Sequence, residues 1–138
     1  MRVEGVMRRT AAVIFENDFL ERAACMLAEH QLEGTVVCRR EGEIVGVLTV
    51  KDVLFGLVQG KTTVCEVMRP PSPPLSTSAC IEDIEFGDGP LRPVVDENGR
   101  LAGVLTNGQY LAAYAKAVQL RLKHMDAIFN AAHNGILS

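Results

Sequence analysis

The chain contains an internal repeat, and this repeat restricts its fold more than any other feature. Three blocks of the first half recur in the same order in the second half: VMR at 6–8 recurs at 67–69, VV at 36–37 at 94–95, and GEIVGVLT at 42–49 as GRLAGVLT at 99–106. The longest block keeps five of its eight residues. Such a pattern indicates a tandem duplication, so we expect two similar units that bury a core together.

Each copy is expected to have the order β-α-β-β-α. In the first copy, the ranges are a strand at 12–15, a helix from Asn17-Asp18, a strand at 35–39, a strand at 43–48 and a helix from about 49 to 58. Asp18 and Glu21 have the spacing of a capping box for the first helix. One face of this helix is apolar at three- and four-residue spacing, and comprises Leu20, Ala23, Ala24 and Leu27.

The second copy is shorter in its first half. Matching positions are 61 residues apart at the start of the repeat and 58 apart at the valine doublets, so three residues are missing. Residues 78–84 allow only a short helix, because two glycines and a proline follow at 87–90. Between the copies, the RPPSPP segment at 69–74 is expected to be extended. It is either a flexible linker or, as its position favours, a rigid entry into the second repeat.

Composition excludes several classes of function. The formal net charge of −3 argues against a nucleic-acid-binding domain, and the absence of Trp, with 5% aromatic residues, argues against a stacking platform for single strands. The sequence has no apolar run of about 20 residues and no signal peptide at its start. We therefore expect a cytoplasmic protein that does not contact membranes.

The cysteines and histidines do not suggest a metal site. Cys25, Cys38, Cys65 and Cys80 are widely spaced without a C-x-x-C pair, and the three histidines do not cluster with them in sequence. In a reducing compartment such cysteines are expected to behave as small buried hydrophobic residues. No nucleophile with a neighbouring base is evident, so we expect neither a required cofactor nor an enzyme.

These repeated blocks resemble tandem cystathionine-β-synthase (CBS) domains, also called a Bateman module. The resemblance covers residues 3 to about 117 and is carried by the VMR heads, the VV strand and GVLTVKD at 46–52. It implies an α+β fold of two β-α-β-β-α repeats, packed as a pseudo-twofold pair with ligand clefts between them. It also implies AMP, ADP, ATP or S-adenosylmethionine as the ligand and association into homodimers. The expected domains are 1–60, 61–117 and a tail at 118–138.

The same resemblance implies a set of ligand-binding residues. The hydroxyl of Thr49 would contact phosphate, Lys51 would help to neutralise it, and the carboxylate of Asp52 would accept hydrogen bonds from both ribose hydroxyls. Both Thr49 and Asp52 fall where a strand becomes a helix, and free N–H groups there attract anions. The adenine is expected against the segments Ala12-Val13 and Thr35-Val36.

A helix cap explains the same residues without any ligand. Thr49 and Asp52 have the spacing of a capping box, in which both side chains bond the start of the helix. The second copy has Thr106 and Gln109 at these positions, which preserves a cap but loses the carboxylate. The second half-site, built on Val94 and Thr106, is therefore expected to be the weaker of the two.

The C-terminal tail carries a helical apolar stripe. Its residues alternate at four- and three-residue spacing, and comprise Leu111, Ala115, Val118, Leu122, Met125, Phe129 and Ala132. This spacing is typical of a coiled-coil seam, with packing of the helix on its own module as the alternative. Residues 122–138 also resemble the start of a PAS domain, in which a helix leads to a strand at Gly135-Ile136-Leu137. On that reading the chain is a fragment of a longer regulator, such as a bacterial transcription activator with CBS and PAS domains.

The resulting hypothesis is a regulatory module that senses an adenine nucleotide or a related adenosyl ligand and signals to a fused output domain. The rival hypothesis is a module that binds no ligand and serves as a dimerisation scaffold in a larger signalling protein. Gln109 and the shortened second repeat favour the rival, whereas Asp52 favours ligand binding.

Overall fold

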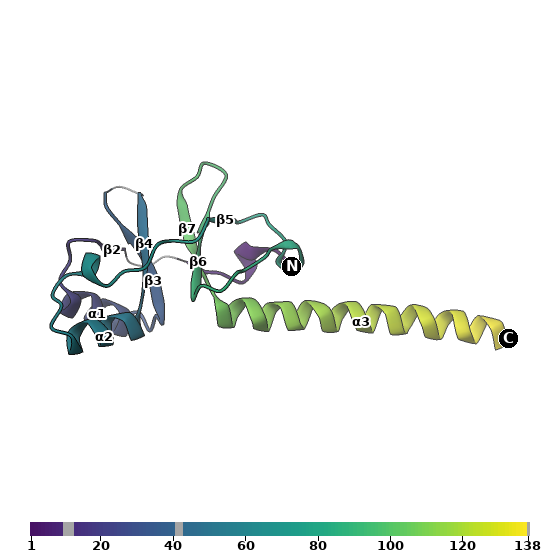
Figure 1. Ribbon diagram of the computed structural model, residues 1–138. Coiled ribbons are helices and arrows are strands. Elements are labelled where there is room, and N and C mark those ends of the chain that lie inside the picture. Colours follow the sequence, from purple (N-terminus) through teal and green to yellow (C-terminus); the bar gives the residue numbers. More distant parts are fainter. Residues whose placement is uncertain (10–12, 41–42, 138) are drawn as a thin grey trace.

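Two small β-sheets face each other in this molecule, and one long helix extends away from them (Figure 1). The computed structural model describes residues 1–9, 13–40 and 43–137, with side chains up to residue 128. The expected α+β fold of two packed repeats followed by a long C-terminal helix is confirmed.

The first repeat forms a three-stranded sheet with two helices. Its elements are β2 (Ile14–Phe15), α1 (Leu20–Glu29), β3 (Gly34–Cys38), β4 (Ile44–Thr49) and α2 (Val50–Val58). In the strand order β2-β3-β4, the strand β3 is parallel to β2 and antiparallel to β4. The predicted apolar face of α1 is confirmed, because Leu20, Ala23 and Leu27 are buried in one cluster with Leu48 and Val53.

The start of α1 differs from the prediction. Its N-cap is Phe19, which makes no capping hydrogen bond through its side chain. The carboxylate of Asp18 instead accepts a hydrogen bond from the backbone N–H of Phe15, at 3.0 Å. The predicted capping box of Asp18 and Glu21 is therefore wrong, because Asp18 closes the turn that precedes the helix.

The second repeat forms a four-stranded sheet. Its elements are β5 (Leu75–Ser76), β6 (Leu91–Val95), β7 (Leu101–Thr106) and, from the beginning of the chain, β1 (Arg8–Arg9). The strand order is β1-β7-β6-β5, in which β1 is antiparallel to β7. The first segment of the chain thus completes the sheet of the second repeat.

The heads of the two repeats are exchanged between the cores. A short 3-10 helix at Val3–Gly5 places Val3 in the core of the second repeat, and another at Val64–Glu66 places Val64 in the core of the first. Gly46 and Gly103 permit this crossing, since a Cβ on either would collide with the backbone oxygen of Arg69 or Arg8, respectively. Residues on each side of the expected domain boundary, at 60 and 61, therefore pack in the core of the other repeat. The boundary stays a prediction, which describes where the repeat in the sequence begins again.

Strand register corrects the alignment of the two copies. Val37 lies opposite Gly46 and Val94 lies opposite Gly103, so Val94 is the counterpart of Val37 and not of Val36. The spacing is 94 − 37 = 57, as it is between Thr49 and Thr106, and not the 58 read from the valine doublets. The second copy is therefore shorter by 61 − 57 = 4 residues and not by three, because the two valine doublets are offset by one position relative to the strands.

Where the first repeat has α1, the second has only a 3-10 helix at Ile81–Asp83, as the sequence predicts. Two side chains cover this part of the second core. Phe86 is buried and stacks on Tyr110 with ring centroids 5.0 Å apart. Arg92 is also buried, and its guanidinium donates to the backbone oxygens of Pro73, Glu85 and Phe86 at 2.8, 2.9 and 3.0 Å. Arg92 thus stabilises the loop that stands in place of a helix.

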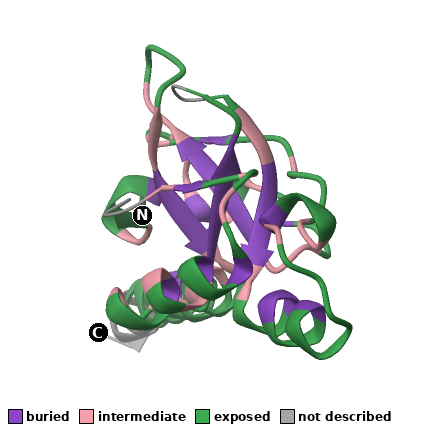
Figure 2. Cartoon of the chain, turned by 90° about the vertical axis from the view of Figure 1, so that its left-hand side faces the viewer, coloured by how far each residue is buried: buried purple, intermediate pink, exposed green. Residues whose placement is uncertain are grey.

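A third apolar cluster joins the two sheets. It is formed by Val36, Cys38, Val47, Leu91 and Val104, all of which are buried. Figure 2 shows these central strands largely buried, with exposed loops and partly exposed helices around them. The two repeats therefore share one interior.

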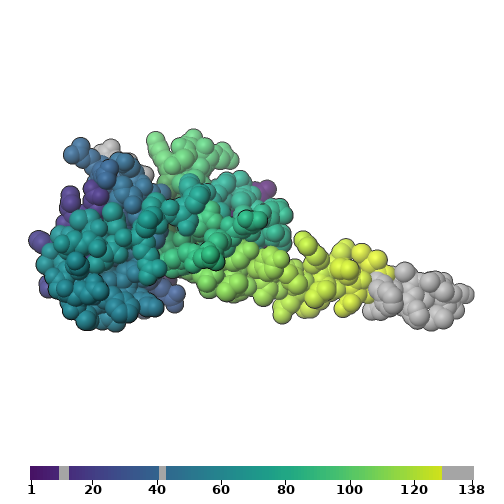
Figure 3. Space-filling view, in the orientation of Figure 1, coloured from purple at the N-terminus to yellow at the C-terminus, as the bar shows by residue number. Residues whose placement is uncertain are grey.

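The last element, α3 (Asn107–Leu137), extends well beyond the body of the molecule (Figure 3). Ala113 and Ala117 are buried against the second repeat, whereas residues 118–128 are exposed. Residues 135–137 continue this helix, so the strand implied by the PAS resemblance is wrong. None of the described helices is both long and apolar enough to cross a membrane.

Candidate functional site

The site is centred on the junction of β4 and α2, where Thr49 is the N-cap of α2. The hydroxyl oxygen of Thr49 accepts a hydrogen bond from the N–H of Asp52, and the carboxylate Oδ2 of Asp52 accepts one from the N–H of Thr49, each at 3.1 Å. The capping box is therefore present. A threonine hydroxyl also has a proton to donate, so capping leaves Thr49 able to bond an anion.

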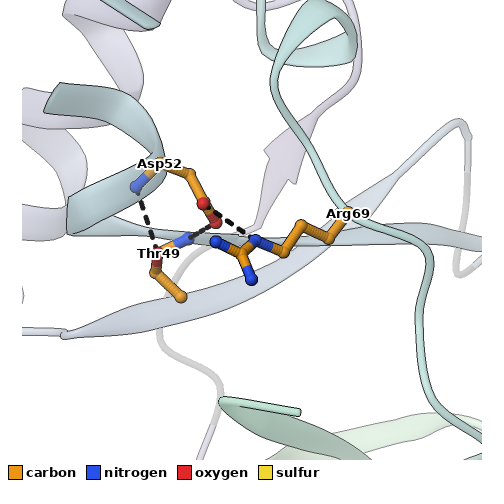
Figure 4. Close-up of polar contacts among 3 residues, drawn as sticks. All are labelled: Thr49, Asp52 and Arg69. Atoms are coloured by element: carbon orange, nitrogen blue, oxygen red, sulfur yellow. Dashed lines mark hydrogen bonds and ion pairs between the residues drawn. The ribbon is translucent and has the colours of Figure 1, made fainter. Parts of the chain in front are cut away.

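The other carboxylate oxygen of Asp52 has a partner that the sequence did not suggest. The Nε of Arg69 donates to Oδ1 at 2.9 Å (Figure 4). The side chain of Asp52 is only 7% exposed, whereas that of Arg69 is 54% exposed. A buried carboxylate is thus paired with a cation from the segment that enters the second repeat.

A cleft of about 390 Å³ opens beside this ion pair. Thr49, Lys51 and Arg69 line it from the first repeat and the linker. The remaining lining residues come from the start of β3 and from the second repeat, and comprise Glu33, Gly34, Asp88, Gly89, Pro90, Leu91, Thr106 and Asn107. The cleft therefore holds two cationic and two anionic side chains near the N-termini of two helices, where unpaired N–H groups favour anions.

A smaller cleft of about 270 Å³ is related to the first by the repeat. It is lined by Arg8, Gln31, Leu32, Glu33, Gly34, Val104, Thr106, Gly108 and Gln109. Thr106 and Gln109 reproduce the reciprocal capping bonds of Thr49 and Asp52, at 3.0 and 3.2 Å. Arg8 has the place of Arg69, but it donates to the backbone oxygens of His30 and Gln31 at 2.6 and 3.0 Å. The second cleft thus has a neutral amide where the first has a carboxylate.

The structure brings some of the predicted ligand residues together and separates others. Thr49 and Lys51 line the larger cleft, and Asp52 lies beside it, behind Arg69. Thr35 and Val36 are buried in the interior, and so is Val94 of the second half-site. Thr106 lines both clefts, and Val13 packs beside the cluster between the sheets. Ala12 lies outside the described residues.

Sequence reasoning missed Arg69 and most of the second-repeat lining. A signal for Arg69 was present, because Arg8 and Arg69 end the duplicated VMR blocks. The segment at 87–90 carries Asp88 into the cleft; the sequence predicts a loop there but gives it no role in the site. Glu33 and Gly34 precede the predicted strand, so the wall of the cleft lies just before the Thr35-Val36 segment.

The cysteines only partly follow the expectation of burial. Cys38 is buried between the sheets, and burial raises the pKa of its thiol, because the charged thiolate is poorly solvated there. Cys25 and Cys65 are exposed, so the expectation is wrong for these two. Within the described part of the chain, no three His, Cys, Asp or Glu side chains are grouped so that they could hold a metal ion.

Comparisons with known proteins agree with this fold. Residues 3–59 match the family model of the CBS domain. CBSX2 from Arabidopsis thaliana is 26% identical, with a TM-score of 0.62 over 87% of this chain and 96% of that one. A structure of CBSX2 in complex with AMP is 24% identical, with the same TM-score over 87% and 98% of the two chains. No curated protein matched the sequence.

A solved structure of another protein has a higher TM-score. The CBS domain pair of protein MJ0100, solved with 5'-methylthioadenosine and S-adenosyl-L-methionine, is 20% identical, with a TM-score of 0.69 over 85% of this chain and 98% of that one. The chain therefore has the fold of a CBS domain pair, and residues 3–59, which contain most of its first repeat, match the CBS family model. The matched family model and these structures do not indicate an enzyme family.

Proposed function

We propose that this chain is a regulatory ligand-sensing module that binds an adenine nucleotide or a related adenosyl ligand in the larger cleft. The observation that carries the proposal is the buried carboxylate of Asp52 at a helix N-terminus, beside a cleft lined by Thr49, Lys51 and Arg69. A carboxylate accepts at two oxygens, which suits the two adjacent hydroxyls of a ribose. Thr49, Lys51 and the helix N-terminus supply donors and positive charge for a phosphate.

The solved relatives support this class of ligand. CBSX2 has been solved with AMP, and the CBS domain pair of MJ0100 with 5'-methylthioadenosine and S-adenosyl-L-methionine. All three ligands carry an adenosine with a ribose. In this chain the adenine would lie near Glu33 and Gly34 at the start of β3. These residues directly precede the Thr35-Val36 segment, which was the expected adenine contact.

Replacing Asp52 by Asn tests the proposal. We expect D52N to weaken AMP binding by about 1–3 kcal/mol, because the ribose hydroxyls lose a charged acceptor. The fold should be kept but somewhat destabilised, since the amide oxygen of Asn still accepts from the N–H of Thr49 whereas its NH2 group cannot accept from the Nε of Arg69. Isothermal titration with AMP measures the first effect and urea unfolding the second. The control is D83N, an exposed Asp→Asn change on the 3-10 helix of the second repeat. Equal AMP affinities of the wild type and D52N would contradict the proposal.

The two clefts are expected to be unequal. Gln109 replaces the carboxylate in the smaller cleft, so a ribose there meets an amide with one acceptor oxygen. We therefore expect titration to approach one AMP per chain. Q109E would raise the affinity of the second cleft by restoring an anionic acceptor. Two equivalent tight sites in the wild type would show that the carboxylate does not distinguish the clefts.

The second candidate function is a scaffold without ligand. It is favoured by the pairing of Arg69 with Asp52, which satisfies the carboxylate internally, and by the neutral Gln109. A thermal-shift screen with AMP, ADP, ATP and S-adenosylmethionine separates the two functions. A ligand at a hundred times its Kd stabilises the fold by about 2.7 kcal/mol, whereas a scaffold is not stabilised by any of them.

We also propose that the module is a homodimer and that α3 transmits its signal to an attached output domain. Leu111, Val118, Leu122 and Met125 of the predicted seam are exposed along α3, and the side chains at 129 and 132 lie outside the described residues. The stripe is separate from the side of the helix that packs on the module, which is formed by Tyr110, Ala113 and Ala117. A second copy of the chain would cover the stripe, and movement between the repeats would then change the packing of the paired helices.

A further inference from the structure

Each oxygen of the Asp52 carboxylate already accepts one hydrogen bond from the protein. Oδ2 accepts from the N–H of Thr49, and Oδ1 accepts from the Nε of Arg69. The first bond belongs to the backbone at the helix start and is fixed by the fold. The second comes from a half-exposed side chain, for which it is the single polar side-chain contact within the described residues. Arg69 lines the cleft and Asp52 does not, so a ribose in the cleft must displace the guanidinium of Arg69 to reach Oδ1 of Asp52.

We propose that Arg69 determines ligand specificity by exchanging Asp52 for an anionic group of the ligand. The inference rests on the proposed nucleotide site and adds the class of ligand, an adenosine derivative that carries phosphate. A neutral nucleoside offers hydroxyls to Asp52 but no partner to the displaced guanidinium of Arg69. The guanidinium then exchanges its ion pair with a buried carboxylate for contact with water alone, which weakens binding. A phosphate offers that guanidinium a bidentate charged partner within the same cleft.

The charges around the cleft strengthen this requirement. Glu33 and Asp88 line the same cleft as Lys51 and Arg69. With Arg69 held by Asp52, the charge of its guanidinium is directed at that carboxylate, and Lys51 is the cationic lining side chain left to meet an anion. Once Arg69 turns to the ligand, the positive charge reaches the phosphate, and the ribose hydroxyls replace it as donors to Asp52. Phosphate and ribose therefore assist each other's binding, and adenosine, which has no anionic group, gains no such assistance.

The second repeat supplies a natural comparison. Arg8 ends the first VMR block as Arg69 ends the second, but its guanidinium bonds the backbone oxygens of His30 and Gln31. The position equivalent to Asp52 is the neutral Gln109, whose side chain is engaged with Thr106. Removal of the Arg8 side chain therefore releases no carboxylate. The exchange is specific to the larger cleft.

The test compares AMP with adenosine on the full chain by isothermal titration. We expect the wild type to bind AMP at least tenfold more tightly than adenosine. In R69Q, adenosine should bind several-fold more tightly than in the wild type, because Asp52 is released, and AMP should bind more weakly. The ratio of the two affinities should fall about tenfold. R8Q should not tighten adenosine binding. An unchanged ratio in R69Q, or equal weakening of both ligands, would overturn the inference.

A measurement without ligand separates this inference from the proposed function. The Nε–H resonance of Arg69, assigned by its loss in R69Q, should be protected from solvent exchange in the free protein and should lose that protection in D52N. If D52N leaves the resonance unchanged, Arg69 does not occupy Asp52 and the inference fails, even where AMP binds. If the resonance responds to D52N but neither AMP nor adenosine binds the wild type, the proposed function is wrong. Arg69 then has no role in ligand specificity either, although it pairs with Asp52.

Discussion

Replacing Arg92 by Met is expected to lower the free energy of unfolding by about 3 kcal/mol. The guanidinium donates to three backbone oxygens, two of them in the loop that replaces a helix in the second repeat. Met fills much of the same volume but donates no hydrogen bond. The oxygens of Pro73, Glu85 and Phe86 would then lose a charged donor in a place that water reaches poorly. Each such loss costs on the order of 1–3 kcal/mol, and relaxation of the loop recovers part of the total.

Urea unfolding of the purified chain measures the effect. R92K is expected to fall between R92M and the wild type, because an ammonium group keeps the charge but reaches fewer of the oxygens. R100M is the control, since Arg100 is exposed in the turn before β7 and should change stability by less than about 0.5 kcal/mol. If R92M unfolds within about 0.5 kcal/mol of the wild type, the loop is held by Phe86 and Tyr110 without help from Arg92.

These oxygens compensate the guanidinium of Arg92 for the hydration that it loses on burial. Burial lowers the pKa of its guanidinium, because the charged form loses hydration, yet an arginine in a protein stays protonated. The structure gives the buried Arg92 carbonyl partners and no carboxylate within hydrogen-bond distance among the described residues. The residue therefore stabilises the fold through hydrogen bonds to the backbone and not through an ion pair.

The architecture could be predicted because the duplication is visible in the amino-acid sequence. Blocks that recur in order identify two similar units, and alternation and helical spacing then locate β3, β4, α1 and α2 to within a few residues. The capping box at Thr49 and Asp52 was also readable, since it joins residues three apart. Local patterns of this kind are sufficient wherever the contact itself is local.

The sequence did not predict the contacts that cross between repeats. Arg69 meets Asp52 because the head of each repeat packs in the other repeat's core, with Val3 in the second and Val64 in the first. Nothing in a duplicated sequence distinguishes this exchange from two self-contained units. Arg92 was missed for a related reason, since an arginine in a strand suggests solvent exposure until the loop that covers it is known.

The substitution L122K is expected to weaken the proposed homodimer about a hundredfold. Leu122 lies in the exposed stripe of α3, and burying such a side chain contributes about 1.5–3 kcal/mol. In a parallel pair of helices, each chain brings one introduced lysine to the seam, where the two charges also repel each other. A loss of about 3 kcal/mol corresponds to roughly a hundredfold in Kd.

Sedimentation equilibrium on the full chain, with the wild type and L122K at matched concentrations, measures this loss. The control is A127K, which adds the same charge to an exposed position on the other side of the helix. A chain that ends at Ala117 lacks the projecting half of α3 and should lose as much affinity as L122K or more. A monomeric wild type would overturn the coiled-coil proposal. Dimers of equal strength in the wild type, L122K and the shortened chain would place the interface elsewhere, with the exposed Leu54, Phe55 and Val58 of α2 as the next surface to change.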